Sequence, residues 1–196
     1  LECGQCFRWD RQPDGSYWGT AGGKALCVSQ DHMEAAMDDP FWRAYFDLDR
    51  DYAAIREALS ASGPVLAKAA AFAPGIRILQ QDPWEALCSF IISQNNNIPR
   101  IKGIISRLCE AFGEEMEQGV RCFPSPERLA GLEEEDLAYL RCGFRARYIL
   151  DAARKVASGE VDLKALRTAP LAQAREQLGK PRTVKRVVIA GRFACD

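Results

Sequence analysis

The sequence predicts an α+β protein that is mainly helical, with a small antiparallel β part at its N-terminus. Two observations lead to this prediction. Strand-favouring aromatic residues and turn signals gather in residues 4–30, whereas apolar residues from about position 38 onward recur with helical spacing. The 196 residues allow one large domain or a domain and a half, and an apolar content of 47% is ample for a core.

Residues 4–30 have the pattern of an antiparallel meander. The residues that favour strands are Phe7, Trp9, Tyr17 and Trp18. Pro13-Asp14-Gly15 is a strong turn signal, and Gly22-Gly23 gives a second turn before residues 25–28. So few strands need partners to be stable, and Leu1 is not an initiator methionine, so we expect further strands upstream.

Helical patterns fill the rest of the chain. Two kinds of signal predict these helices: acidic residues, Ser-Pro or Asp-Pro at their starts, and apolar residues along one face. The predicted helices are 49–59, 65–72, 84–93, 99–112, 134–139, 145–157, 162–166 and 171–178, and a short one begins at Ser125-Pro126. In 84–93 the apolar residues occupy more than one face, which predicts a central buried helix.

The charge distribution is more informative than the net charge of −1. Residues 1–140 carry 13 basic and 22 acidic side chains, whereas residues 141–196 carry 13 basic and 5 acidic ones. A basic segment on an acidic chain is the electrostatic pattern expected of a nucleic-acid contact. No apolar run approaches the length of a membrane span, so we expect no membrane association.

The eight cysteines do not predict a metal site. Cys3 and Cys6 have zinc-knuckle spacing, but the sequence has no second Cys pair for a four-ligand site and its only histidine is His32. Cys88 and Cys109 lie inside apolar helical patterns, where a thiol acts as a small hydrophobe. We therefore expect reduced cysteines and neither a metal nor an organic cofactor.

Asn95-Asn96-Asn97 interrupts two apolar helices. Asn side chains compete for nearby backbone groups, so they break the helix, and Pro99 suits the first turn of the next one. A helix cap needs one Asn; three in a row suggest a ligand with hydrogen-bonding edges. The alternative is an Asn-rich turn and cap without a ligand.

Three segments in this order, 4–9 (GQCFRW), 93–100 (SQNNNIPR) and 143–148 (GFRARY), together with the connecting residues 78–85 (ILQQDPWE) and 101–112, resemble the 8-oxoguanine DNA glycosylases of the helix-hairpin-helix DNA-repair superfamily. The resemblance runs from Leu1 to about Leu178. It implies a helical glycosylase domain preceded by an antiparallel β domain. It also implies that a damaged base is flipped out of duplex DNA.

The resemblance assigns roles to four residues at the duplex. Asn95 enters the gap left by the flipped base and faces the unpaired partner base, where Arg100 and Arg145 join it. Phe144 wedges against the base stack; the family commonly has Tyr here, so the ring is kept and the hydroxyl is lost. The alternative for Arg145 and its neighbour Arg147 is a solvated basic helix start.

Gly4 is the residue that the resemblance assigns to lesion recognition. Its carbonyl would accept a hydrogen bond from the N7 hydrogen that 8-oxoguanine has and guanine lacks, and glycine permits the close approach. The alternative is that Gly4 and Gln5 only begin a strand. We expect Phe7 and Trp9 to belong to the core.

The family's catalytic motif is not found where the resemblance places it. The family uses a Gly-Val-Gly-x-Lys hairpin, whose lysine attacks the sugar and forms a Schiff base, and a later Asp. That lysine should fall near position 187, which is Val187. Either the reading frame is broken near Leu178, or Lys185 is a displaced nucleophile; a solvated lysine is the alternative for Lys185. We therefore set 179–196 apart as an atypical tail, after a β remnant over 1–35 and a helical domain over 36–178.

These inferences predict a fragment of an 8-oxoguanine DNA glycosylase with abasic-site lyase activity, itself lacking the catalytic centre. The expected partner is duplex DNA containing oxidised guanine, bound by a monomer inside the cell, in the nucleoid of a bacterium or the nucleus of a eukaryote. Three alternatives stay open: a non-catalytic damage-binding fragment, a related glycosylase for another lesion such as an alkylated purine, and a helical module with no nucleic-acid role.

Overall fold

The computed structural model describes residues 1, 4–29, 31–116 and 119–179. It is mainly helical with one three-stranded antiparallel sheet among these residues, which confirms the predicted fold class. The chain divides into two compact units, one made of residues 1–29 with 81 onward and the other of residues 30–80. The domain boundaries expected after 35 and after 178 remain predictions.

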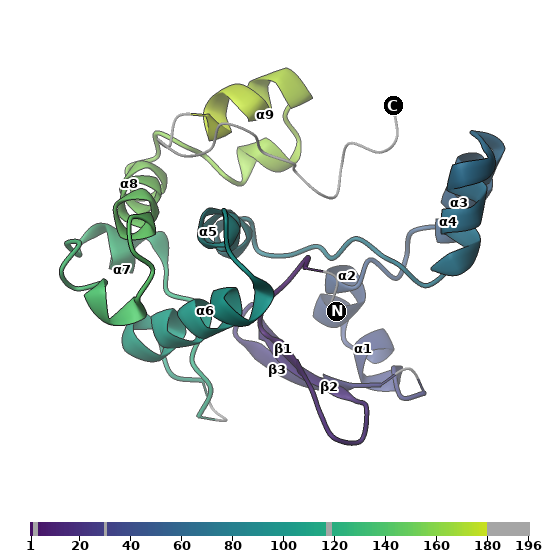
Figure 1. The fold of residues 1–196 in the computed structure, drawn as a ribbon, viewed down its shortest axis with the longest axis horizontal. Coiled ribbons are helices and arrows are strands. Elements are labelled where there is room, and N and C mark those ends of the chain that lie inside the picture. Colours follow the sequence, from purple (N-terminus) through teal and green to yellow (C-terminus); the bar gives the residue numbers. More distant parts are fainter. Residues whose placement is uncertain (2–3, 30, 117–118, 180–196) are drawn as a thin grey trace. The chain divides into compact units, whose positions relative to one another are not determined.

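The sheet has the strand order β1-β2-β3 (Figure 1), with bounds β1 Trp9–Arg11, β2 Tyr17–Ala21 and β3 Lys24–Val28. The Asp14 side chain closes the first turn by accepting from the backbone N–H of Ser16 at 2.9 Å and from its hydroxyl at 2.7 Å. Opposite Trp9 lies Gly19, where an added Cβ would approach the indole to 2.3 Å. The meander predicted from the aromatic and turn residues is confirmed.

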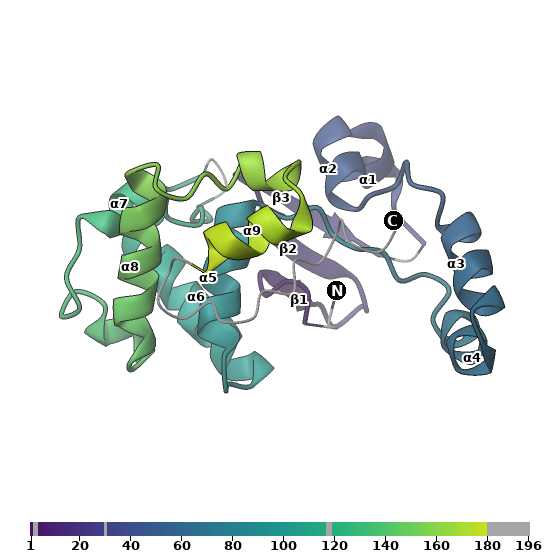
Figure 2. The ribbon, with the colours of Figure 1, turned by 90° about the horizontal axis from the view of Figure 1, so that it is seen from above.

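The helical core of the first unit is built on three long helices. The helices of this unit are α5 Pro83–Ser93, α6 Ile98–Phe112, α7 Pro126–Ala130, α8 Arg145–Ala157 and α9 Leu171–Leu178, with 3-10 turns η1 Ala138–Leu140 and η2 Ala165–Arg167. Helix α5 packs against α6 and α8 (Figure 2), and α8 also packs against α7. The fully buried residues Ile91, Ile104 and Ile149 come one from each long helix. The buried position predicted for 84–93 is confirmed.

Polar side chains fix where these helices begin. At α5, the Asp82 carboxylate accepts from the backbone N–H groups of Trp84 at 3.0 Å and Glu85 at 2.9 Å. At α7, the Ser125 hydroxyl accepts from the N–H of Arg128 at 3.2 Å. Both starts match the Asp-Pro and Ser-Pro signals, because these side chains satisfy donors that have no partner within the helix.

The helix predicted over 134–139 is wrong. Residues 134–137 form turns, and only the single 3-10 turn η1 follows. The reason is local: the Asp136 carboxylate accepts from the backbone N–H of Glu133 at 2.9 Å and closes a turn. The helix expected over 162–166 is likewise reduced to a turn that leads into η2.

The second unit contains four helices among its described residues: α1 Glu34–Asp38, α2 Pro40–Tyr45, α3 Tyr52–Ala61 and α4 Pro64–Phe72. In α2, the Trp42 ring makes edge-on contacts with Phe41 and Tyr45. The Tyr52 hydroxyl donates to Asp47 at 2.8 Å and accepts from the N–H of Ile78 at 2.8 Å, so it links the start of α3 to the segment after α4.

Candidate nucleic-acid interface

The Asn turn, residues 94–97, joins α5 to α6, and its three asparagines have different surroundings. Asn97 caps α6 by accepting from the N–H of Arg100 at 3.0 Å, and Asn96 donates to the carbonyl of Ile92 at 3.1 Å. Turn and cap therefore account for two of them. Asn95 has a left-handed backbone with φ of 49° and an exposed side chain, and no described residue hydrogen-bonds to its amide. The left-handed backbone suits an asparagine at this position, and the exposed Asn95 side chain keeps its donors and acceptors available to a ligand.

Arg145, at the start of α8, hydrogen-bonds to the main chain of this turn. Its side chain is buried, with the residue 5% exposed. The guanidinium donates to the carbonyl of Gln94 through Nε at 3.2 Å and also through Nη2, to the carbonyl of Asn95 at 3.1 Å, and to that of Cys142 at 3.4 Å. A cation beside the carbonyl end of α5 is favourable. Arg145 is thus not the solvated side chain of the alternative, and its contact with a partner base stays a prediction.

Phe144 projects from the same point. It precedes α8, and the residue is 53% exposed. The Arg145 guanidinium lies 4.7 Å from the centre of its ring, and the Tyr148 ring meets it edge-on at 5.9 Å. An exposed aromatic ring braced on two sides has the character of a wedge, because it is held in place although half of its surface is in water.

Two further arginines place positive charge around Asn95 and Phe144. Arg100 is exposed on the first turn of α6, where its guanidinium reaches the carbonyl of Arg141 at 3.5 Å. Arg147 is exposed on α8 and lies over the Tyr148 ring, 4.8 Å from its centre. The structure therefore brings together the predicted residues Asn95, Arg100, Phe144 and Arg145, which we call the Asn95–Phe144 surface.

Gly4 is exposed, with φ of 81°, a conformation that favours glycine. The residues after it are anchored: Gln81 donates to the carbonyl of Gln5 at 2.6 Å, and Trp9 is only 2% exposed. Phe7 packs against the main core, so the expectation that Phe7 and Trp9 are core residues is confirmed. The role of Gly4 remains a prediction.

A buried ion pair beside this segment was not predicted from the sequence. Arg8 and Glu85 approach to 3.5 Å, with side chains 10% and 12% exposed. Burial raises the pKa of Glu85 to about 7, and the attraction of Arg8 offsets only part of that effect. A glutamate within the apolar face of residues 84–92 is the signal that could have revealed the pair.

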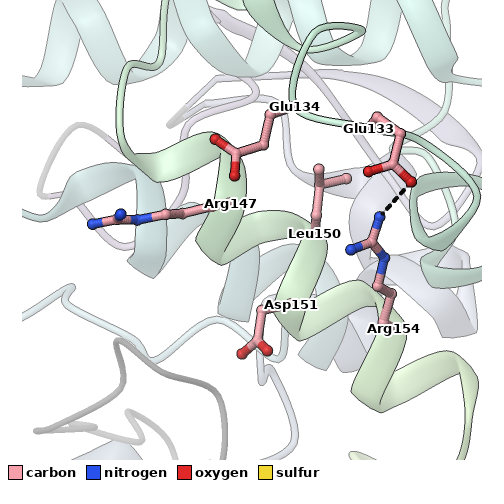
Figure 3. Close-up of a pocket in the computed structure, with 6 residues that line it drawn as sticks. All are labelled: Glu133, Glu134, Arg147, Leu150, Asp151 and Arg154. Carbon is pink, nitrogen blue, oxygen red and sulfur yellow. Dashed lines mark hydrogen bonds and ion pairs between the residues drawn. The ribbon is translucent and has the colours of Figure 1, made fainter.

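A cleft of about 240 Å³ lies between α8 and the segment 133–137 (Figure 3), and Arg147, which also flanks the Asn95–Phe144 surface, is one of its lining residues. It is lined by Glu133, Glu134, Arg147, Leu150, Asp151 and Arg154. The Arg154–Glu133 ion pair, at 3.1 Å, crosses one end. Three carboxylates beside two arginines do not favour a phosphate, so the cleft is not part of the candidate interface.

Comparison with known families decides what this scaffold is. Residues 88–191 match the HhH-GPD superfamily of base excision DNA repair proteins, and residues 1–87 match the N-terminal domain of 8-oxoguanine DNA glycosylases. The chain belongs to the 8-oxoguanine DNA glycosylase family of this superfamily. The resemblance drawn from three short segments is thereby confirmed, and the HhH-GPD match continues through part of the tail set apart as atypical.

Two relatives of this glycosylase-family chain show which enzymes it is similar to and how much of their length it spans. An N-glycosylase/DNA lyase of Saccharomyces cerevisiae is 44% identical over 93 residues, which are 45% of this chain and 25% of that protein. A DNA-3-methyladenine glycosylase of Bacillus subtilis is 32% identical over 145 residues, 71% of this chain and 48% of its own length. The chain thus spans between a quarter and a half of these relatives.

A solved structure gives the fold-level comparison. The 8-oxoguanine glycosylase/lyase of Clostridium acetobutylicum, solved with duplex DNA containing cytosine opposite 8-oxoguanine, superimposes with a TM-score of 0.81 and 36% identity. The match covers 93% of this glycosylase-family chain and 66% of that one. The described residues therefore have the fold of a DNA-bound member of the family.

Two features bear on a cofactor or a membrane. Among the described residues, no group of three or more His, Cys, Asp or Glu side chains is placed to hold a metal ion. In the same ranges, every helix is too short or too polar to cross a bilayer. Lys185, the candidate nucleophile, lies outside the described residues.

Proposed function

We propose that this protein acts in base-excision repair, by removing 8-oxoguanine from duplex DNA and cleaving the resulting abasic site. The observation that carries the proposal is the Asn95–Phe144 surface, on the scaffold of a DNA glycosylase family. The Asn95 side chain is exposed while the guanidinium of Arg145 binds its backbone carbonyl, and the exposed Phe144 ring packs against the same guanidinium. We further propose that it binds DNA as a monomer and needs no metal or organic cofactor.

In this proposal the surface fills the space left by the extruded nucleotide. Asn95 offers both donors and acceptors to the edge of the unpaired base, and Phe144 wedges into the stack beside it. Arg100 is exposed and can turn from its 3.5 Å contact to the base edge or a phosphate. Arg145 acts mainly through the carbonyls it holds, with its cationic edge close to the gap.

Gly4 is proposed as the lesion-recognition residue. Gly4 has no side chain to hinder the approach of a base to its carbonyl, and the anchored residues after it limit how far that carbonyl can move. Guanine would present an acceptor to this carbonyl and leave it unpaired, whereas 8-oxoguanine presents a hydrogen.

The proposed chemistry is attack of a lysine amine on the sugar C1′, which displaces the base; the C1′–O4′ bond of the sugar ring then breaks and a Schiff base forms. Loss of a proton from C2′ expels the 3′-phosphate and cleaves the strand by β-elimination. Lys185 is the candidate nucleophile in this chain, because Val187 stands where the family resemblance places the lysine. Because the Gly-Val-Gly-x-Lys pattern is not found where the resemblance places it, we propose that the chain binds damaged duplex and carries out this chemistry slowly.

Borohydride trapping tests these points together. The chain and its Lys185→Ala variant are incubated with an 8-oxoguanine:cytosine duplex, and base release, strand cleavage and covalent adduct are measured beside duplex binding. An adduct that disappears in Lys185→Ala supports the nucleophile. An adduct that persists in the variant contradicts it, and binding without any adduct leaves damage recognition as the function of this chain. Absence of preferential binding to the damaged duplex overturns the proposal.

A second candidate function is excision of an alkylated purine, favoured by the 32% identity to the Bacillus subtilis DNA-3-methyladenine glycosylase. The match of residues 1–87 to the 8-oxoguanine glycosylase N-terminal domain argues for the first candidate. Competition between unlabelled 8-oxoguanine and alkylated duplexes separates the two, because the first candidate predicts that the 8-oxoguanine duplex competes better.

A further inference from the structure

Arg107 makes a contact for which neither the fold nor the predicted site gives a role. It lies on α6, about three turns after the end of the Asn turn, and its guanidinium forms no ion pair with a carboxylate of the described residues. Both Nε and Nη2 donate to the carbonyl oxygen of Leu140, at 3.2 and 2.9 Å. A guanidinium with two bonds to one main-chain oxygen fixes the position of that oxygen relative to the helix.

Gly103 shows that α6 is shaped around this contact. Glycine is unfavourable inside a helix compared with alanine. One turn before Arg107, however, a Cβ at position 103 would lie 3.3 Å from Arg107 Nη1. The glycine therefore leaves room for the guanidinium to lie along the helix and reach Leu140.

Leu140 begins the loop that carries Phe144. This loop has left-handed backbone at Arg141 and Gly143, with φ of 55° and 59°, so it lacks the regular bonds of a helix. Three consecutive carbonyls, those of residues 140, 141 and 142, accept from the guanidinium groups of Arg107, Arg100 and Arg145 respectively, and the last also accepts from the backbone N–H of Arg145 at 3.4 Å. The loop is thus held by arginines on its neighbours.

The three contacts differ in strength. Arg100 makes one bond at 3.5 Å from an exposed position, so it can leave the loop to contact DNA. Arg145 divides its guanidinium between Cys142 and the Asn turn. Arg107 makes two shorter bonds from a partly buried position, and it would still hold the loop after Arg100 has turned away.

We propose that Arg107 is a positioning residue of the Asn95–Phe144 surface, which holds the Phe144 loop on α6 at the spacing from Asn95 that insertion into a duplex requires. This inference rests on the proposed function. Arg107 does not touch DNA in this scheme; it acts through the carbonyl of Leu140.

The test compares Arg107→Met with Arg154→Met, a matched control. Both substitutions keep an apolar stem and remove a guanidinium that binds main-chain carbonyls. Arg154 donates to those of Ala130 at 3.3 Å and Leu132 at 2.8 Å, and it lies beside the cleft rather than at the interface. The probe is a duplex with an abasic-site analogue opposite 2-aminopurine, whose fluorescence rises when it unstacks. The reference probe is the fully paired duplex.

Arg107→Met should bind the abasic duplex about tenfold more weakly and give a smaller fluorescence rise at saturation, because loss of charged hydrogen bonds frees the loop. Binding to the paired duplex should not change. Arg154→Met should match the wild type, and Arg107→Lys should recover part of the fluorescence rise. Equal behaviour of Arg107→Met and the wild type, or equal losses in both methionine variants, would overturn the inference.

Amide hydrogen exchange separates positioning from general destabilisation. Residues 138–144 should exchange faster in Arg107→Met, with α5 and α6 protected as in the wild type. If α5 and α6 also lose protection in Arg107→Met, that variant is destabilised as a whole, and Arg107→Lys is compared with the wild type instead. A fluorescence rise equal to that of the wild type, with no faster exchange at residues 138–144, supports the inference. Loss of the fluorescence rise while residues 138–144 exchange at the wild-type rate overturns it. A wild type that gives no fluorescence rise and no preference for the abasic duplex contradicts the proposed function instead.

Discussion

Substitution of Glu85 by Gln should remove a large pH dependence of stability. In the folded protein, burial raises the pKa of this carboxyl from an ordinary value of 4.5 to about 7, so the folded state binds a proton that the unfolded state has already lost. Stability from this group is fully present below about pH 4.5 and is lost as the pH rises through about 7. The direction is opposite to that of a carboxylate whose pKa is lowered by folding.

The magnitude follows from the two pKa values. At about 1.4 kcal/mol per pH unit, the difference between 4.5 and about 7 corresponds to about 3 kcal/mol, of which about 2.5 kcal/mol falls between pH 5 and pH 8. The side chain of Glu85 is only 12% exposed, so solvent screening reduces this figure little.

Urea unfolding of the wild type and Glu85→Gln across this pH range is the assay. The free energy of unfolding of the wild type, minus that of the variant, should fall by about 2.5 kcal/mol between pH 5 and pH 8. Glu133→Gln is the matched control: it also removes a carboxylate paired with an arginine, but Glu133 is 74% exposed, and its profile should parallel that of the wild type. A difference that stays constant with pH, or that rises, would refute the assignment of the buried proton to Glu85.

Three further predictions concern stability and reactivity. Asn97→Ala should lower the free energy of unfolding by about 1 kcal/mol, because the cap of α6 is lost; no change in urea unfolding would contradict this. In native protein at about pH 8, a thiol reagent followed by peptide mass mapping should modify exposed Cys27 well before Cys109, whose pKa burial raises to about 12; equal rates would contradict the burial. Gly103→Ala should gain clearly less than the roughly 1 kcal/mol usual for a helix interior, because the methyl group crowds Arg107; a full gain measured by urea unfolding would show that Arg107 moves aside freely.

The elements that local chemistry determines were predictable from the sequence. Asp82 and Ser125 mark helix starts because each is followed by proline and caps its own helix, and the strands follow from aromatic residues separated by turn signals. The prediction of a helix over 134–139 was wrong for a local reason. A carboxylate that can face water in a helix can also close a turn, as the Asp136 carboxylate does.

The residues of the candidate site were predictable from the sequence, but the contacts that each of them makes were not. The sequence predicts that Asn95 and Arg145 belong to one site. It does not show that Arg145 is buried against the carbonyls of the Asn turn, because that contact joins residues 50 positions apart. The same holds for Arg8 with Glu85 and for Arg107 with Leu140. Long-range polar contacts depend on tertiary packing, which periodicity and turn chemistry do not specify.

The measurement that tests the central claim most directly is competition binding with Asn95→Gly. Glycine suits the left-handed backbone of position 95, so this change removes the exposed amide without straining the turn. The wild type should prefer an 8-oxoguanine:cytosine duplex to the unmodified duplex, and the variant should lose about tenfold of its affinity for the damaged duplex with its thermal unfolding unchanged. A wild type that does not discriminate between the duplexes, or a variant that binds both as the wild type does, would contradict the account.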